Sequence, residues 1–215
     1  MQNRIKKFQS LKSKWELFKS NNPKVRIRDA ASHLDVSEAE LLSTAIGKNV
    51  AFLSINSLNG FLNEILSFGK FMLLIRSDAV VHEKTISSDD VSFVGDQIVF
   101  NSNNSILIEL RTSLFKFCFF ESKKHKNQIL KSIQMFTSKG EAFLKIYFKG
   151  TNVKQFEKTA LKYEVEYNYE LQAVNQEIAK DVSINYFDKL ALCFRTNYKQ
   201  KKYNQFELNV KVLRQ

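Results

Sequence analysis

Apolar residues in the first third of the chain recur at steps of three and four, the spacing of one face of an α-helix. This pattern predicts an amphipathic helix over residues 5–20, two short helices over 28–46 around a turn at Asp35, and a further helix from Leu58 to Phe68. Gly69 follows directly and suits the end of that helix, because glycine readily adopts the backbone conformation of a C-terminal cap.

After Gly69 the helical period gives way to short runs rich in Val, Ile, Phe and Tyr, separated by turn signals such as Ser-Asp, Gly-Asp and Asn-Ser-Asn-Asn. This alternation predicts an antiparallel meander. The sequence "SKGE" predicts a hairpin turn in which Gly140 takes a positive φ. From Asn152 the helical period returns. The pattern therefore predicts an α+β fold, with N-terminal helices, a large antiparallel sheet and C-terminal helices.

Composition narrows the class of protein. The chain has 215 residues, 44% of them hydrophobic, which is enough for a folded domain with a sizeable core. The longest apolar runs, "FMLLI" and "FKFCFF", are too short to cross a bilayer, so no membrane insertion is expected, and the N-terminus does not read as a signal peptide. Cys118 and Cys193 lie far apart without a CxxC pair, which argues against a zinc site or disulfide scaffold and favours a cytoplasmic location.

The net charge of +11 raises the question of nucleic acid, and "DAASHLDVSEAELL" has the outline of a helix-turn-helix. However, the positive charge lies in residues 1–28 and 111–215, whereas residues 29–110 carry a net charge of −7. Ser37 and Glu40 form a predicted capping box, so Glu38 and Glu40 stand where a recognition helix would meet the bases. We therefore expect this helix pair to pack on a core and do not expect nucleic acid as its partner. The apolar positions predicted to make that contact are Ala30, Leu34, Val36, Ala39, Leu41 and Leu42.

Three blocks in order, "LKSKWELFKSNNPKVRIRDAASHLDVSEAELL", "RSDAVVHEK" and "SIQMFTSKGEAFLKIYF", resemble the haemin-degrading factor family, the HemS/ChuX superfamily. The resemblance covers roughly residues 11–175. It implies a cytosolic protein that accepts imported haem. Longer members hold haem between two similar halves and some degrade it, whereas smaller members have one unit and pair into dimers.

The chain resembles the first half of the long form, and its tail from about Asp181 resembles the opening of a second half. We therefore expect a HemS/ChuX-like domain over residues 1–175. Residues 176–215 are expected to be a linker with an incomplete start of a second repeat, or a peripheral helix. Binding of haem is expected, in a homodimer that rebuilds the second wall of the cleft. The sequence leaves open whether the chain degrades haem or is a truncated, non-catalytic relic.

The resemblance also implies site residues. His82 in "VVHEK" matches a histidine of the first half in relatives, and it is the candidate ligand of the haem iron. Arg111 in "IELR" matches an arginine that faces the haem, although a gapless alignment would put Glu109 there. By the two-residue period of a strand, Arg111 shares a face with Glu109. Arg111 and Arg76 are candidate cations for the haem propionates. The alternatives are a half-buried surface histidine and arginines in structural ion pairs.

The remaining candidates have plainer interpretations. His33 is expected to be structural, and His125 lies in a basic loop expected to be solvated, together with the lysines Lys123, Lys124, Lys126 and Lys131. By the two-residue period, Phe115, Phe117 and Phe119 share one face of a strand. They are expected in the core, and they would wall a porphyrin only if that face is uncovered. The haem hypothesis as a whole requires an aromatic-lined sheet surface that is open on one side.

Other kinds of site are not indicated. The chain shows no phosphate-binding glycine loop and no Ser/His/Asp spacing. The competing functions are a basic nucleic-acid-associated regulator that uses the N-terminal helix pair, and a scaffold without a ligand.

Overall fold

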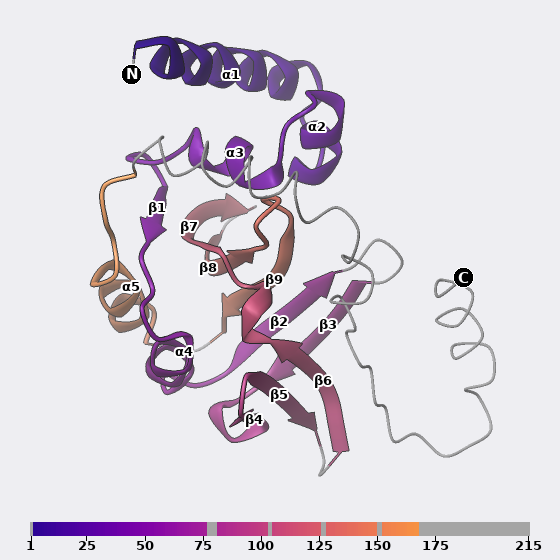
Figure 1. Cartoon of the computed structure of the whole chain (residues 1–215), viewed down its shortest axis with the longest axis vertical. Helices are drawn as coiled ribbons and strands as arrows, with labels where there is room; N and C mark the ends of the chain where they lie inside the picture. The colour runs from indigo at the N-terminus through magenta and orange to yellow at the C-terminus, as the bar shows by residue number, and fades with distance from the viewer. Residues whose placement is uncertain (1, 77–80, 103–104, 126–127, 150–151, 168–215) are drawn as a thin grey trace, which may run out of the picture.

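The computed structural model of the chain describes residues 2–76, 81–102, 105–125, 128–149 and 152–167. It confirms the α+β prediction, because helices pack on antiparallel strands (Figure 1). Predictions that fall on residues 168–215, including the second-repeat tail and Cys193, lie outside the described residues.

The helices agree with the apolar periodicity of the sequence. In chain order they are α1 (Gln2–Asn21), α2 (Ile27–His33), α3 (Glu38–Ser43), α4 (Leu58–Leu66) and α5 (Val153–Leu161), with short 3-10 turns η1 (Ser88–Asp90) and η2 (Thr112–Leu114). The turn between α2 and α3 lies at Asp35, which has a φ of 54°. The C-cap of α4 is Ser67, so Gly69, with a φ of 124°, lies two residues past the cap position predicted for it.

The strands form two antiparallel sheets, whereas the sequence pattern predicted one. In chain order they are β1 (Val50–Leu53), β2 (Phe71–Arg76), β3 (Val81–Ile86), β4 (Val91–Val94), β5 (Gln97–Ser102), β6 (Ser105–Arg111), β7 (Phe117–His125), β8 (Gln128–Phe136) and β9 (Ala142–Phe148). The large sheet has the order β1-β7-β8-β9-β2-β3, and β4-β5-β6 form a second sheet.

Pairing between distant strands explains what the pattern missed. The predicted hairpins are present, but β2 also pairs with β9, and all the strands from β3 to β8 lie between these two in the chain. Local pattern cannot reveal such a contact. The strand β1 was missed because all four of its residues are buried and show no alternation.

The large sheet has a core face and a second face. Directly paired residues share a face. The core face carries Leu73 and Ile75 of β2, and α4, α5 and the three-stranded sheet bury it in one cluster. In Figure 1 the two helices lie beside the sheet and the three-stranded sheet lies below it. Representative members of that cluster are Phe61, Leu62, Phe71, Phe100, Leu110, Ile133, Ile146 and Phe156.

The second face carries Met72, Leu74 and Arg76 of β2, and α3 covers its β1 end. Five of the six residues of α3 are buried, and Ala39 packs with Phe52 and Phe119 of the sheet. The prediction that the α2–α3 pair packs on a core is therefore confirmed. A helix held in this way cannot enter a DNA groove without leaving the sheet.

A hairpin turn locks α3 in place. Ser37 accepts a hydrogen bond from the Glu40 N–H, and its own N–H donates to the Glu40 carboxylate at 2.8 Å, which is the predicted capping box. The N–H of Ala39 donates to the carbonyl of Gly140 at 3.0 Å. Gly140 has the predicted positive φ, 74°. The β8–β9 turn and the start of α3 thus form one unit.

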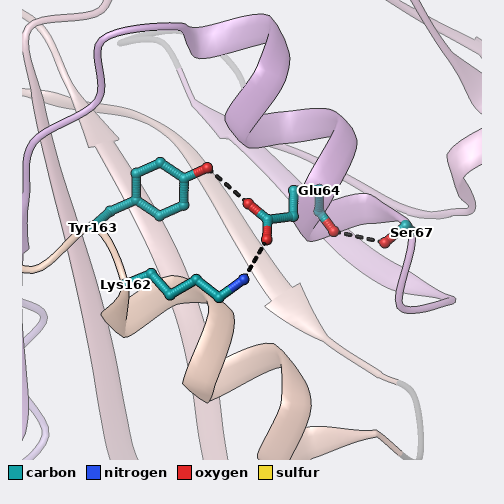
Figure 2. A network of polar contacts seen from close by, with 4 residues as sticks. All are labelled: Glu64, Ser67, Lys162 and Tyr163. Carbon is teal, nitrogen blue, oxygen red and sulfur yellow. Dashed lines mark hydrogen bonds and ion pairs between the residues drawn. The ribbon is translucent and has the colours of Figure 1, made fainter.

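A polar network joins α4 to the end of α5 (Figure 2). The carboxylate of Glu64 accepts a hydrogen bond from Lys162 Nζ at 2.9 Å and from the Tyr163 hydroxyl at 2.7 Å. These two hydrogen bonds, that from Lys162 first, lower the pKa of Glu64 below its usual 4.5. The same contact raises the pKa of Tyr163.

We expect Glu64→Gln to lower the free energy of unfolding at pH 7 by about 0.5–1 kcal/mol, because the pair is partly exposed and screened by solvent. A lowered carboxyl pKa stabilises the fold above pH 4.5, and this contribution is lost as the pH falls below that value. The difference from the unaltered chain should therefore shrink towards pH 3 in urea unfolding. Glu16→Gln is the control, because its carboxylate is 61% exposed and lies 3.6 Å from Lys48. An equal effect of both changes would contradict this assignment.

Candidate functional site

His82 lies on β3, the edge strand of the large sheet, opposite Ile75 of β2. This register places its side chain on the core face, in the cross-strand row Leu53, Cys118, Met135, Leu144, Ile75 and His82. The imidazole is half-buried, and its Nε2 is buried without a hydrogen-bond partner among the described residues. A buried polar atom without a partner is costly, so such an atom in a folded protein calls for an explanation.

Burial also sets the protonation state of His82. Desolvation, and secondly the charge of Lys84, lower the pKa of this imidazole below its usual 6.5. The ring is therefore neutral at pH 7. A neutral imidazole nitrogen is the form that binds a transition metal.

Arg76 lies next to His82 in the β2–β3 hairpin but on the other side of the sheet. It pairs with Val81, and its side chain belongs to the second face. There it is one of the cations that act on Glu38 and Lys145. His82 and Arg76 are therefore near in the backbone and separated by the thickness of the sheet.

Arg111 ends β6 of the three-stranded sheet, opposite Gln97. As predicted, it shares a face with Glu109, because the alternating residue Leu110 enters the core. Arg111 is exposed, and among the described residues no carboxylate forms an ion pair with it. The structure thus does not gather His82, Arg76 and Arg111 into one pocket within a single copy.

A charged cluster on the second face was missed by the sequence interpretation. Glu38, 5% exposed, accepts the backbone N–H of Ala142 and lies near the charges of Lys145, Arg28 and Arg76. Desolvation raises the pKa of Glu38 and lowers that of Lys145, and each opposes the shift of the other. The signal in the sequence was a lysine inside the apolar strand "AFLKIYF", where only a buried partner makes that residue tolerable.

Polar side chains continue from this cluster along β8 and β7. Gln134 donates to the Glu121 carboxylate at 2.6 Å. Tyr147 follows Lys145 on β9, and burial first, then the negative charges of Glu121 and Glu83, raise its pKa to about 12. The second face is therefore apolar beneath α3 and polar towards β9.

The aromatic residues of β7 are core, as predicted for Phe119. Phe119 is 1% exposed and contacts Phe52, Phe136 and Tyr167. Phe115 lies before β7 and packs against the core-face cluster, so it does not extend a row with Phe117 and Phe119 as the two-residue period predicted. The condition for a porphyrin wall on this strand, an uncovered aromatic face, is therefore not met, because α3 and Tyr167 cover it, and a haem site would have to lie elsewhere on the molecule.

The other histidines and the described cysteine have ordinary settings. His33 ends α2, is exposed and stacks on Phe18 with ring centroids 4.6 Å apart. His125 is exposed, as predicted, but it lies at the end of strand β7 and not in a loop. Cys118 is buried, and desolvation raises the pKa of its thiol, which makes it a poor nucleophile. Within the described residues no helix is long and apolar enough to cross a membrane.

Comparisons with known proteins cover most of the described domain. The model of the family "Haemin-degrading HemS.ChuX domain" matches residues 35–163, a stretch that includes His82, Arg76 and Arg111. No curated protein matches the chain.

Solved structures share the fold. Holo-PhuS, a heme-binding protein from Pseudomonas aeruginosa, is 24% identical with a TM-score of 0.66, over 74% of this chain and 46% of PhuS. The heme-degrading enzyme ChuS from Escherichia coli O157:H7 is 20% identical with a TM-score of 0.68, over 77% of this chain and 50% of ChuS. The heme-binding protein ChuX is 13% identical with a TM-score of 0.56, over 69% of this chain and 97% of ChuX. The chain thus spans about half the length of PhuS and ChuS.

Proposed function

This chain belongs to the haemin-degrading HemS.ChuX domain family, and from this premise we propose that it binds haem in haem and iron utilisation. The observation that carries the proposal is the family match over residues 35–163. The heme-binding proteins PhuS and ChuX, whose structures share the fold, support it. Within this proposal the protein accepts imported haem in the cytoplasm for transfer, storage or degradation.

The described residues offer a candidate nitrogen for haem iron, which haem could reach only if the groups that cover it move aside. His82 Nε2 is buried without a partner among them, and the lowered pKa keeps the imidazole neutral, as an iron ligand must be. We assign iron ligation to this side chain. Haem would supply a redox-active iron, and the chain would supply the ligand, an apolar surrounding and the orientation of the ring.

The cations proposed for the propionates lie apart from His82. Arg76 is on the opposite face of the sheet, and Arg111 is exposed on the second sheet. An arginine such as Arg111, which forms no ion pair with a described carboxylate, can form a bidentate pair with a propionate. Because one copy does not bring His82 and the arginines together, the proposal includes a homodimer in which a second copy completes the site.

The test is a titration of the purified chain with haemin, followed by its Soret absorption, with sedimentation velocity on the same samples. We expect a shifted Soret band that saturates at a fixed ratio of haem to chain, in a species of twice the mass of the chain. Bleaching of the band after addition of a reductant in air would indicate that the chain degrades haem. A stable band would indicate that it carries or stores haem. A spectrum identical to that of haemin in buffer alone would overturn haem binding.

A further inference from the structure

The hairpin of β7 and β8 extends past the sheet that it belongs to. On one side β7 is bonded only as far as Ser122, whose N–H donates to the Asn49 carbonyl at 2.9 Å. On the other side β8 pairs with β9 from Ser132 onward. Beyond these points Lys123–His125 and Gln128–Leu130 pair only with each other among the described strands. At about 3.4 Å per residue, this two-stranded arm projects roughly 10 Å.

Each face of the arm sets a lysine directly opposite an aliphatic side chain. Lys124 pairs with Ile129, and Lys123 pairs with Leu130. Both lysines are exposed, Ile129 is 65% exposed, and Leu130 is half-buried. The described residues of the arm include no carboxylate. Lys131, at its base, is already committed to an ion pair with Glu157 of α5.

Exposure of such an arm to water is unfavourable in free energy. An isolated two-stranded ribbon is only marginally stable, and an exposed isoleucine gains nothing from solvent. Lysines beside exposed aliphatic groups fit a boundary at which an anionic layer lies over an apolar one, because the stems of the lysines lie along the apolar layer while their charges reach the anions. The net charge of +11 adds long-range attraction to any anionic surface.

We propose that the β7–β8 arm docks the protein on an anionic bilayer surface, with Ile129 entering the headgroup region, Lys124 contacting lipid phosphates from the same face and Lys123 reaching them from the other face of the arm. Duplex nucleic acid would use the lysines, but its grooves are read by hydrogen bonds and phosphate contacts, for which Ile129 is of little use. The aliphatic residue opposite each lysine therefore favours lipid. The attachment is peripheral and involves no spanning segment.

The test is cosedimentation of the full chain with mixed vesicles of phosphatidylcholine and phosphatidylglycerol, compared with vesicles of phosphatidylcholine alone. We expect Lys123→Gln/Lys124→Gln to reduce the partition coefficient on the mixed vesicles about 25-fold, at roughly fivefold for each lysine near the surface. Ile129→Ser should reduce it about fivefold, through loss of the buried apolar group.

Leu17→Ser is the matched control for Ile129→Ser. Leu17 on α1 is also 65% exposed, so its replacement removes a similar apolar group and should leave the binding unchanged. Thermal melting of each variant checks that the fold persists, as expected for exposed positions.

Two outcomes would overturn the proposal. One is that the arm variants bind the mixed vesicles as the unaltered chain does, whether that binding is strong or absent. The other is loss of binding in the lysine variant with no effect of Ile129→Ser, together with equal retention on duplex DNA, which would mark a surface for polyanions in general. None of these readouts depends on haem, so the proposed function can fail or hold separately.

Discussion

Replacing His82 by alanine should weaken haemin binding by at least tenfold and blue-shift the Soret band towards that of unligated haemin. Loss of a group that only orients a metal ligand costs about 10–100-fold in affinity, and His82 is assigned as the ligand itself. The physical basis is the buried Nε2 without a partner among the described residues, in an imidazole that desolvation keeps neutral. The measurement is a haemin titration at pH 7 monitored by absorption.

The chain supplies its own controls for this experiment. His33 and His125 are exposed, so His33→Ala and His125→Ala remove an imidazole without touching the buried one. Both should retain the affinity of the unaltered chain. If His125→Ala reduced binding and His82→Ala did not, the ligand would have to be reassigned to the exposed end of β7. Urea unfolding of the His82 variant separates loss of a ligand from loss of the fold.

Gly140→Ala should lower the free energy of unfolding by about 2–4 kcal/mol, as the sum of a backbone cost and a packing cost. Gly140 has a φ of 74°, in the left-handed region. An L-residue there costs roughly 1–2 kcal/mol, and overpacking adds a cost of similar size. A Cβ at this position would lie 2.5 Å from Ser37 Oγ and 2.6 Å from Ser37 Cβ. Since this turn holds the start of α3, the variant should also loosen the cover of the second face. Chemical denaturation measures the change.

Gly95→Ala isolates the backbone part of this effect. Gly95 also has a positive φ, 59°. Nothing lies within 4 Å of the added methyl group. Gly95→Ala should therefore lower the free energy of unfolding only by the backbone cost of roughly 1–2 kcal/mol.

A double variant tests the packing part. In a Ser37→Gly background Gly140→Ala should cost less than alone, because glycine is tolerated as an N-cap and leaves room for the methyl group. Strict additivity of the two changes would show that the contact with Ser37 contributes nothing.

Signals that span a few residues were interpreted correctly from the sequence. The capping box of Ser37 and Glu40, the turn at Asp35 and the positive φ of Gly140 each depend on a short stretch of chain, and the structure contains all three. The burial of Phe119 also followed, because an aromatic residue in an apolar strand is core in most proteins. The sequence did not predict that this strand is covered, since no local signal indicates that α3 and Tyr167 lie over it.

The pairing of the strands needed the tertiary structure. The segment from β4 to β6 closes as a sheet of its own, so β3 does not pair with β4; β2 pairs with β9 on its other side, and β7 pairs with β1. Glu38 and Lys145, more than a hundred residues apart, meet only as a result of this arrangement. Their shifted pKa values follow from burial on the second face, which the residue types alone do not determine.

The positions of His82 and Arg76 show what the sequence determines and what the tertiary structure determines. Alternation along β2 and β3, the strand period and the identity of the residues are properties of the sequence, and they place both side chains in one hairpin. The face on which each lies depends on the register of that hairpin, in which Ile75 pairs with His82 and Arg76 with Val81. A shift of one residue would have paired Arg76 with His82 on a single face. Register is set by how the whole sheet buries its core face, and so only the tertiary structure decided that the imidazole and the guanidinium point to opposite sides.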